Sequence, residues 1–363
     1  MERISPHQFM TLGAAVLLGT TFLPVASIVT GVSGRDGWMS VLPGFAVGIP
    51  YGLMVLSLLA GYPHQNLLQI TETLLGKWFG KMIGVMYIVI TGYFGGLLLG
   101  QVGDIYERSI MPLTPIILFY LGALLLVFYL VGFGIEVFAR FSEVIFPLIV
   151  IALVLNISLS LPRMERGELL PILSEGIIPL LFGALKMIPF VMEYILFLAG
   201  LLTFLPTAKQ EFGQLKSGVW RTVFLIGILD TLVVLIQLLV FGPSEAIRLV
   251  YGLLVLGKLV EISQTFAGVE SLFMGVWLGA SVLKIGAFFF AATWGLEMVF
   301  GVKGVKWNLA LSTVFLGIAL GFGRGQDLIK EIGLVDDYLI LPFTSVWVLI
   351  LWGVSLWKKG AGV

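Results

Sequence analysis

Four ionisable side chains lie deep inside long apolar stretches of the sequence and have the clearest capacity for chemistry. They are Lys186, Glu193, Asp230 and Lys284. A charge left unpaired in the hydrocarbon core of a bilayer is costly, so such residues face the protein interior, pair with one another or line water. Two are acidic and two are basic, which suits structural pairing as well as it suits the binding of a ligand or a proton.

The first apolar stretch is interrupted at its centre by the sequence GTTFLP, residues 19–24. Gly19 relaxes the backbone, and Pro24 lacks a donor and clashes with the preceding turn. The hydroxyls of Thr20 and Thr21 can cap the groups that this frees. Within lipid, a broken helix persists only where it is buried in protein or lines a cavity. The stretch therefore predicts a discontinuous first span that contributes to an internal site.

A second interruption lies in the sixth apolar stretch, in KMIPFVMEY, residues 186–194. Pro189 is at its centre, with Lys186 and Glu193 beside it. Gly19 and Pro189 are nearly half of the chain apart, so the first and sixth spans are predicted to break at corresponding points. Matched breaks are typical of inverted-repeat transporters, which bind a ligand at the membrane midplane between two discontinuous helices. The alternative is a pair of ordinary proline kinks, but the matched positions and the adjacent charge favour the site.

Glu193 adjoins the second break and is the strongest candidate among the four charges. It could partner the amine of a ligand, carry a proton, or simply pair with Lys186 one or two turns away. The first break offers different chemistry. A half-helix that begins after residues 19–21 presents free N–H groups and the positive end of its dipole, which suit a carboxylate. An amino acid is therefore the favoured ligand.

The composition places these breaks in a membrane. The chain is 59% hydrophobic and only 12% charged, with a mean hydropathy of +1.07, whereas soluble domains are about 25% charged. We predict an all-α membrane protein with ten transmembrane helices in one integral membrane domain, 1–363, built from repeats at about 8–161 and 176–357. Two shorter segments, 64–81 and 244–261, are predicted to be interfacial helices. The ten spans are predicted at 8–31, 38–61, 82–102, 114–133, 141–161, 176–202, 219–241, 266–293, 307–323 and 338–357.

Several classes of function have no support in the sequence. There is no cysteine, the two histidines lie outside the spans, and the net charge is zero. We therefore expect no metal site, no cofactor, no nucleic-acid partner and no enzyme activity. An even number of spans places both termini on one side of the membrane. Lys and Arg are more frequent in the loops on that side, which predicts cytoplasmic termini.

Several stretches, spread over nearly the whole chain, resemble the B-subunit family of bacterial spore germinant receptors, the GerAB-type proteins. They are ISPHQF (4–9), GTTFLP (19–24), GRDGW (34–38), LGKWFGK (75–81), IEVFARFSEVIFP (135–147), IPFVME (188–193) and the VESLF…W…LKI pattern (269–285). The resemblance implies membership of the amino acid–polyamine–organocation transporter superfamily and a leucine-transporter-type fold. It also implies a nutrient-sensing subunit in the inner membrane of endospores, working beside an A subunit and a C lipoprotein.

By position, the resemblance carries ligand recognition onto both breaks and onto the eighth span. The first break departs from the family's longer, serine-rich pattern, so its shape is not carried over, and the nutrient is not carried over either. The residues implied to bind the ligand are Gly19, Thr20 and Thr21 in the first span, Pro189, Phe190 and Glu193 in the sixth, and Ser281 and Lys284, near Trp277, in the eighth.

Two classes of function remain. The first is a receptor subunit, in which a nutrient bound at the midplane shifts a conformational equilibrium that partner subunits detect. The second is an amino acid permease that works by alternating access, with a proton carried on Glu193 or Lys284. Four deep charges that cancel could be fully occupied in holding the bundle together, and this economy favours the receptor.

Overall fold

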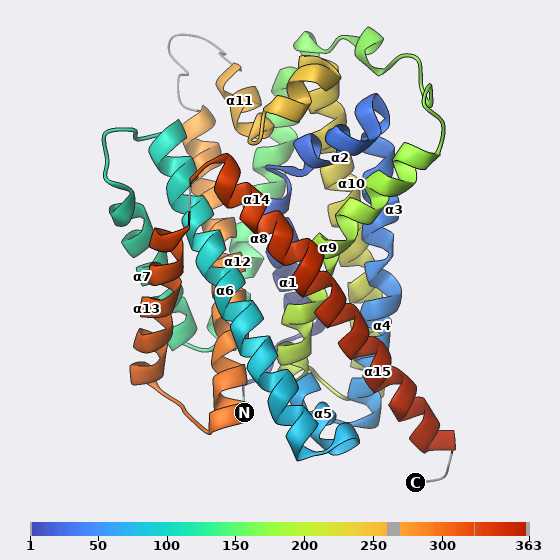
Figure 1. Ribbon diagram of the computed structural model, residues 1–363, viewed down its shortest axis with the longest axis vertical. Helices are drawn as coiled ribbons and strands as arrows, with labels where there is room; N and C mark the ends of the chain where they lie inside the picture. Colours follow the sequence, from blue (N-terminus) through green and yellow to red (C-terminus); the bar gives the residue numbers. More distant parts are fainter. Residues whose placement is uncertain (1, 260–268, 323, 361–363) are drawn as a thin grey trace.

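The computed structural model describes residues 2–259, 269–322 and 324–360, and within these ranges every regular element is helical (Figure 1). Seven helical segments are long and apolar enough to cross a bilayer. A bent pair supplies another crossing, and two apolar helices of 17 residues, α7 (Ile116–Gly132) and α13 (Val305–Gly321), complete the set. The all-helical membrane fold with ten spans is confirmed.

The crossing elements differ from the predicted spans mainly at their ends. The predicted span 266–293 begins, 307–323 ends and the segment 244–261 ends at residues outside the described ranges. Along the chain, the remaining crossing elements are α1 (Pro6–Thr21) with α2 (Val25–Ser33), α3 (Trp38–Ala46) with α4 (Gly48–Gly61), α6 (Lys77–Ser109), α8 (Ile135–Ser160), α9 (Ile178–Leu201), α10 (Lys209–Arg248), α12 (Val269–Phe300), and α14 (Gln326–Val335) with α15 (Leu341–Gly360).

The first span is broken where the sequence predicts. Helix α1 begins with a capping box, in which the Ser5 hydroxyl accepts from the Gln8 amide and the Gln8 side chain accepts from the Ser5 amide. It ends at Thr21, and α2 begins at Val25 after Pro24. The two helices are bent by 65°. A proline at the start of a helix leaves the preceding carbonyls without a donor, so the chain changes direction here.

The sixth span is not broken, and this part of the prediction is wrong. Helix α9 is continuous from Ile178 to Leu201 with Pro189 in its interior. Proline removes one hydrogen bond, here to the carbonyl of Leu185, and usually bends a helix. In α9, however, every residue from Pro189 to Leu201 is buried. Packing on all sides holds the helix in one piece despite the missing bond.

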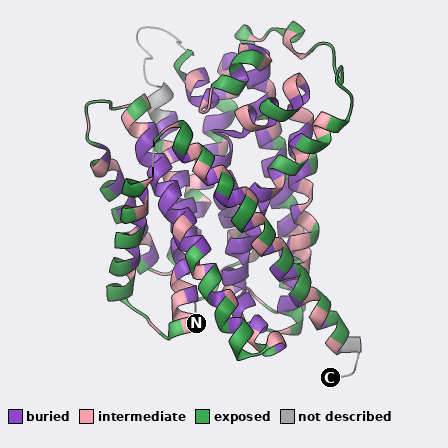
Figure 2. Ribbon diagram, in the orientation of Figure 1, coloured by how far each residue is buried: buried purple, intermediate pink, exposed green. Residues whose placement is uncertain are grey.

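Helices α1, α9 and α12 form the centre of the bundle, where buried residues are most frequent (Figure 2). In the most apolar stretch of the span that contains α9, 83% of the residues are buried. The corresponding figure for the span that contains α8 is 28%. Helix α12 contacts α1, α6 and α8, while α9 contacts α2 and α3. The core therefore brings both predicted break regions against α12.

Two short helices cover the ends of the bundle. Helix α5 (Leu67–Leu75) lies at the end that carries both termini, and α11 (Gly252–Leu259) lies at the opposite end (Figure 1). Both predicted interfacial helices are shorter than expected because their flanks belong to neighbouring spans. Residues 77–81 are the first turns of α6, and α10 continues to Arg248 through a kink at Gly242, where φ is +71°.

The tenth span is longer than predicted and contains a turn of π-helix, Asp336–Ile340, between α14 and α15. The sequence prediction started this span at 338 and assigned Asp336 and Asp337 to a loop. The structure instead places Asp336 in the interior of the bundle, buried among the helices. The mean hydropathy along the sequence does not reveal this, because two consecutive acids lower it at the position where the span continues.

Candidate functional site

The end of α1 lies against α12 with almost no space between the two backbones. A Cβ atom on Gly19 would lie 2.8 Å from the carbonyl oxygen of Ala280 and 3.0 Å from the Cβ of Lys284. Real Cβ atoms essentially never approach a backbone oxygen so closely, so the site needs glycine. Gly19 is thus in direct contact with α12, next to two other predicted site residues, Ser281 and Lys284.

The two threonines before the break are buried, as a site lining requires. Thr20 and Thr21 are 4% and 0% exposed. The Thr21 hydroxyl donates to the carbonyl of Leu17, at 2.6 Å, inside its own helix. The expected capping of freed groups is therefore not what this hydroxyl does, because the Leu17 carbonyl lies one turn before the break. Its oxygen keeps lone pairs that can accept a further hydrogen bond.

Helix α12 presents one polar and aromatic face, formed by Trp277, Ser281 and Lys284 at helical spacing. All three are buried. The indole N–H of Trp277 and the hydroxyl of Ser281 make no hydrogen bond to any residue in the described ranges. Buried polar groups are normally satisfied by protein or water. Two adjacent exceptions on one helix face indicate a place where a ligand or water supplies the missing partner.

Aromatic rings surround this face. Tyr106 of α6 stacks on Trp277 with ring centroids 5.9 Å apart, and its hydroxyl donates to the carbonyl of Met274 at 2.8 Å. Phe22, inside the break, meets Phe273 edge to face at 6.1 Å. The sequence reasoning missed these aromatic partners because nothing local connects Tyr106 to residues far along the chain.

Glu193 pairs with Lys284 and not with Lys186. Lys284 Nζ lies 2.6 Å from Glu193 Oε2, and both side chains are almost completely buried. The structural alternative predicted for Glu193, a pair with Lys186, is therefore wrong. Lys186 instead contacts Asp337 at 2.5 Å on a more exposed face of α9. The ion pair joins α9 to α12 across the centre of the bundle.

The other predicted residues of the sixth span are buried on the same helix. Pro189 and Phe190 lie one turn before Glu193. On its other side, the hydroxyl of Tyr194 is buried without a hydrogen-bond partner among the described residues. A Cβ on Gly13 would lie 2.7 Å from the Tyr194 ring, so α1 also approaches α9 closely.

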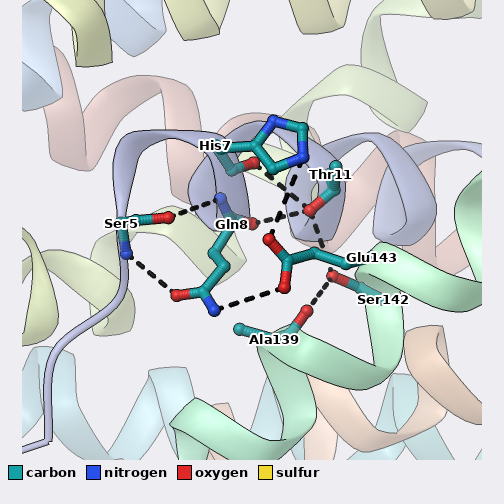
Figure 3. A network of polar contacts seen from close by, with 7 residues as sticks. All are labelled: Ser5, His7, Gln8, Thr11, Ala139, Ser142 and Glu143. Atoms are coloured by element: carbon teal, nitrogen blue, oxygen red, sulfur yellow. Dashed lines mark hydrogen bonds and ion pairs between the residues drawn. The ribbon is translucent and has the colours of Figure 1, made fainter.

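A second polar network fastens the other end of α1 to α8 (Figure 3). Gln8 Nε2 donates to Glu143 Oε2 at 3.3 Å, and the hydroxyls of Thr11 and Ser142 are 3.4 Å apart. His7 Nε2 lies 3.9 Å from Glu143 Oε1. Helix α1 is thus held by α8 at its start and by α12 at its end, and the break follows the second contact.

Cavities open at both ends of the bundle. One, of about 280 Å³, lies beneath α11 and is lined by Asp104, Arg108 and Tyr251 among others. Burial raises the pKa of the Tyr251 phenol well above its usual range. The other, of about 320 Å³, lies at the end that carries the termini, beside Trp294 and Lys303.

Comparison with known proteins agrees with this architecture. The family model described as "Spore germination protein" matches residues 3–322. Spore germination protein KB of Bacillus subtilis (strain 168) is 25% identical over 98% of this chain and 95% of its own length. Spore germination protein A2 of the same organism is 25% identical over 96% of this chain and 93% of its own.

Two solved structures share the fold. MhsT in complex with L-phenylalanine superposes with a TM-score of 0.67 at 15% identity, over 96% of this chain and 89% of MhsT. MHP1, a nucleobase-cation-symport-1 family transporter with bromovinylhydantoin bound, gives a TM-score of 0.70 at 15% identity, over 96% and 78% of the chains. These likenesses confirm the transporter-type fold. The family match covers most of the sequence, and this integral membrane protein therefore belongs to the spore germination protein family.

Proposed function

We propose that this protein is the nutrient-sensing membrane subunit of a spore germinant receptor and binds an amino acid at the break between α1 and α2. The observation that carries the proposal is the uncapped start of α2 inside the bundle. Pro24 provides no side-chain cap, and Val25 and Ala26 are fully buried. The N–H groups of a helix's first turn and its dipole favour a carboxylate.

The side chains around the break fit the rest of an amino acid. The unpartnered Ser281 hydroxyl and Trp277 indole offer polar contacts, while Phe22 and Tyr106 offer apolar surface. Two transporters of the same fold were solved with L-phenylalanine and with bromovinylhydantoin, which supports a small ligand that carries a ring. The proposed binding residues are Gly19, Thr20, Thr21, Pro189, Phe190, Glu193, Ser281 and Lys284.

The receptor assignment adds partners and a location. We propose an A subunit and a C lipoprotein as partners, the inner membrane of the endospore as the location, and cytoplasmic termini. We also propose that residues 8–161 and 176–357 are the two repeats of one domain, and that the protein has no catalytic activity. Binding would shift a two-state equilibrium that the partner subunits detect. A differential affinity of about 3 kcal/mol between the states changes their populations more than a hundredfold without translocation.

The second candidate is an amino acid permease. The buried Glu193–Lys284 pair favours it, because intramembrane ionisable residues often mark proton relays in transporters. The two candidates share the ligand site and differ in whether the ligand crosses the membrane. Uptake of labelled ligand into liposomes that contain only this protein separates them, because saturable uptake requires the permease.

The binding site itself is tested by ligand-induced thermal shift of the purified protein across amino acids, sugars and nucleosides. We expect an amino acid to raise the melting temperature and Thr21→Leu to abolish that shift. Thr91→Leu is the matched control, since Thr91 is also fully buried and donates to the carbonyl one turn earlier at 2.6 Å, but in α6. A ligand shift that persists in Thr21→Leu would place the site elsewhere.

A further inference from the structure

Three buried carboxyl groups from three different elements interact electrostatically with one buried lysine on a fourth. Glu193 belongs to α9, Asp230 to α10, Lys284 to α12 and Asp336 to the π-helix of the tenth span. Their exposed fractions are 1%, 0%, 1% and 3%. The sequence prediction included only three of them and treated their charges as part of a balanced set with Lys186.

The balance of positive and negative charges in this set changes once the actual partner of each residue is known. Lys186 forms an ion pair with Asp337 outside the cluster, so the cluster itself holds three acids and one base. If all four groups were ionised, two negative charges would be uncompensated in a buried, low-dielectric environment. Such a charge is too costly to keep, and the group takes up a proton instead. The charge count therefore requires protons in this cluster.

The contacts favour one place for such a proton. Lys284 Nζ is 2.6 Å from Glu193 Oε2. The carboxyl groups of Glu193 and Asp336 lie within interaction range of each other, and Oε1 of Glu193 and Oδ1 of Asp336 make no hydrogen bond to any described residue. An ionised carboxylate is an acceptor only, so two neighbouring carboxyl groups can hydrogen-bond only if one of them carries a proton, and a shared proton would satisfy these unpartnered oxygens. Asp230 faces Lys284 at longer range, and neither of its oxygens has a hydrogen-bond partner in the described part of the chain.

The π-helix explains how Asp336 reaches this position. Single turns of π-helix are rare and occur frequently at functional sites. The wide turn allows two consecutive acids to meet the same neighbouring helix, with Asp336 at Glu193 and Asp337 at Lys186, and α9 packs directly on this turn. The tenth span thus meets α9 through two neighbouring acids, which a proton would stabilise, and through the Lys186–Asp337 ion pair, which needs none.

The geometry points to a proton-binding site formed by Glu193 and Asp336 beside Lys284, whose occupancy controls the contact between the π-helix and α9. Loss of the proton leaves two neighbouring carboxylates with only Lys284, paired to Glu193, to compensate them, and their repulsion separates the tenth span from α9. This inference deepens the proposed function, on which it rests for the conformational role, because Glu193 and Lys284 also border the ligand site. The proton site itself can be tested without ligand.

The test is infrared spectroscopy of the purified protein in lipid, recorded without ligand between pH 5 and pH 9. We expect C=O stretching bands of protonated carboxyl groups at neutral pH. Asp230→Asn identifies any component that belongs to Asp230, and we expect Asp336→Asn and Glu193→Gln each to remove a second component. Asp337→Asn, a change in the next residue of the same turn, is the matched control and should leave the band. Each amide variant has nearly the shape of the acid that it replaces. The presence of the band in the wild-type protein is itself a test, and it does not depend on the folding of any variant.

A second readout is the pH dependence of folding. The native pair keeps one proton at neutral pH, where unfolded carboxyl groups, with pKa values near 4, have already lost theirs. The folding equilibrium should therefore weaken with rising pH, by up to tenfold per pH unit. Asp336→Asn should flatten this dependence. A wild-type spectrum without the band, a band that only Asp230→Asn removes, or equal effects of Asp336→Asn and Asp337→Asn would each overturn the inference. If the band behaves as expected but no amino acid shifts the melting temperature, the proton site stands and the proposed function fails.

Discussion

The first and sixth spans were expected to be equivalent, and they differ in almost every respect. The first is bent by 65° and has no charged residue at its break. The sixth is continuous through its proline and carries Glu193, which pairs with Lys284. One span therefore offers backbone groups and a helix dipole, and the other offers ionisable side chains.

The two spans therefore provide two kinds of polar group within one bundle. Backbone N–H groups left free at a helix break can bind a neutral or zwitterionic ligand without any change in protonation. A buried carboxyl group in a continuous helix stores charge or a proton, and its energy depends on its partners. Both regions contact α12, through Gly19 on one side and Glu193 on the other. Helix α12 is thus the element through which the two regions can influence each other.

The largest effect is expected at Lys284. Its loss by Lys284→Met leaves the buried carboxyl groups without a base, and removing one partner of a buried ion pair costs about 3–5 kcal/mol. Melting temperature and yield of folded protein in detergent measure this loss. Lys186→Met is the matched control, because that lysine also pairs with a carboxylate but is 45% exposed, and exposed pairs contribute about 0–1 kcal/mol. Equal losses in the two variants would remove the distinction between the central cluster and its surroundings.

A smaller effect is expected at the break itself. Gly19→Ala adds a Cβ where Ala280 leaves no space, and such overpacking costs about 1–3 kcal/mol. Because the added atom pushes α1 from α12, the ligand-induced thermal shift should decrease together with stability. Gly92→Ala in α6 is the control, since nothing lies within 4 Å of its Cβ position. If Gly19→Ala behaved like Gly92→Ala, the contact between the break and α12 would not be needed for binding.

The smallest effect is expected at Pro189, and it tests the asymmetry of the two spans most directly. Pro189→Ala restores a hydrogen bond in a helix that is already continuous. The free energy of unfolding should rise, by less than the roughly 3 kcal/mol that an interior proline costs in an exposed helix. As a proposed binding residue, Pro189 offers only the apolar surface of its ring, so the ligand-induced thermal shift should decrease only slightly. Pro24→Ala, at the start of α2, should instead reduce the ligand shift. A loss of binding in Pro189→Ala would restore the symmetric picture.

Much of this protein could be predicted from local features of its sequence. The ten spans follow from runs of apolar residues, since a bilayer requires about 20 of them in each helix. The break of the first span follows from Gly19 and Pro24, which act on the backbone within one turn. Gly19 and Thr21 were likewise identified from the break, whereas Ser281 came from the family resemblance, and the structure buries all three.

Tertiary structure alone decided the continuity of the sixth span and the partners of its charges. The same proline chemistry that breaks the first span leaves α9 intact, because neighbours on all sides hold that helix. Glu193 lies near Lys186 in the sequence yet pairs with Lys284, and Asp336 enters the core through a π-turn. Ion pairing depends on distances of a few ångströms between side chains, and only the packing of helices far apart along the chain sets those distances.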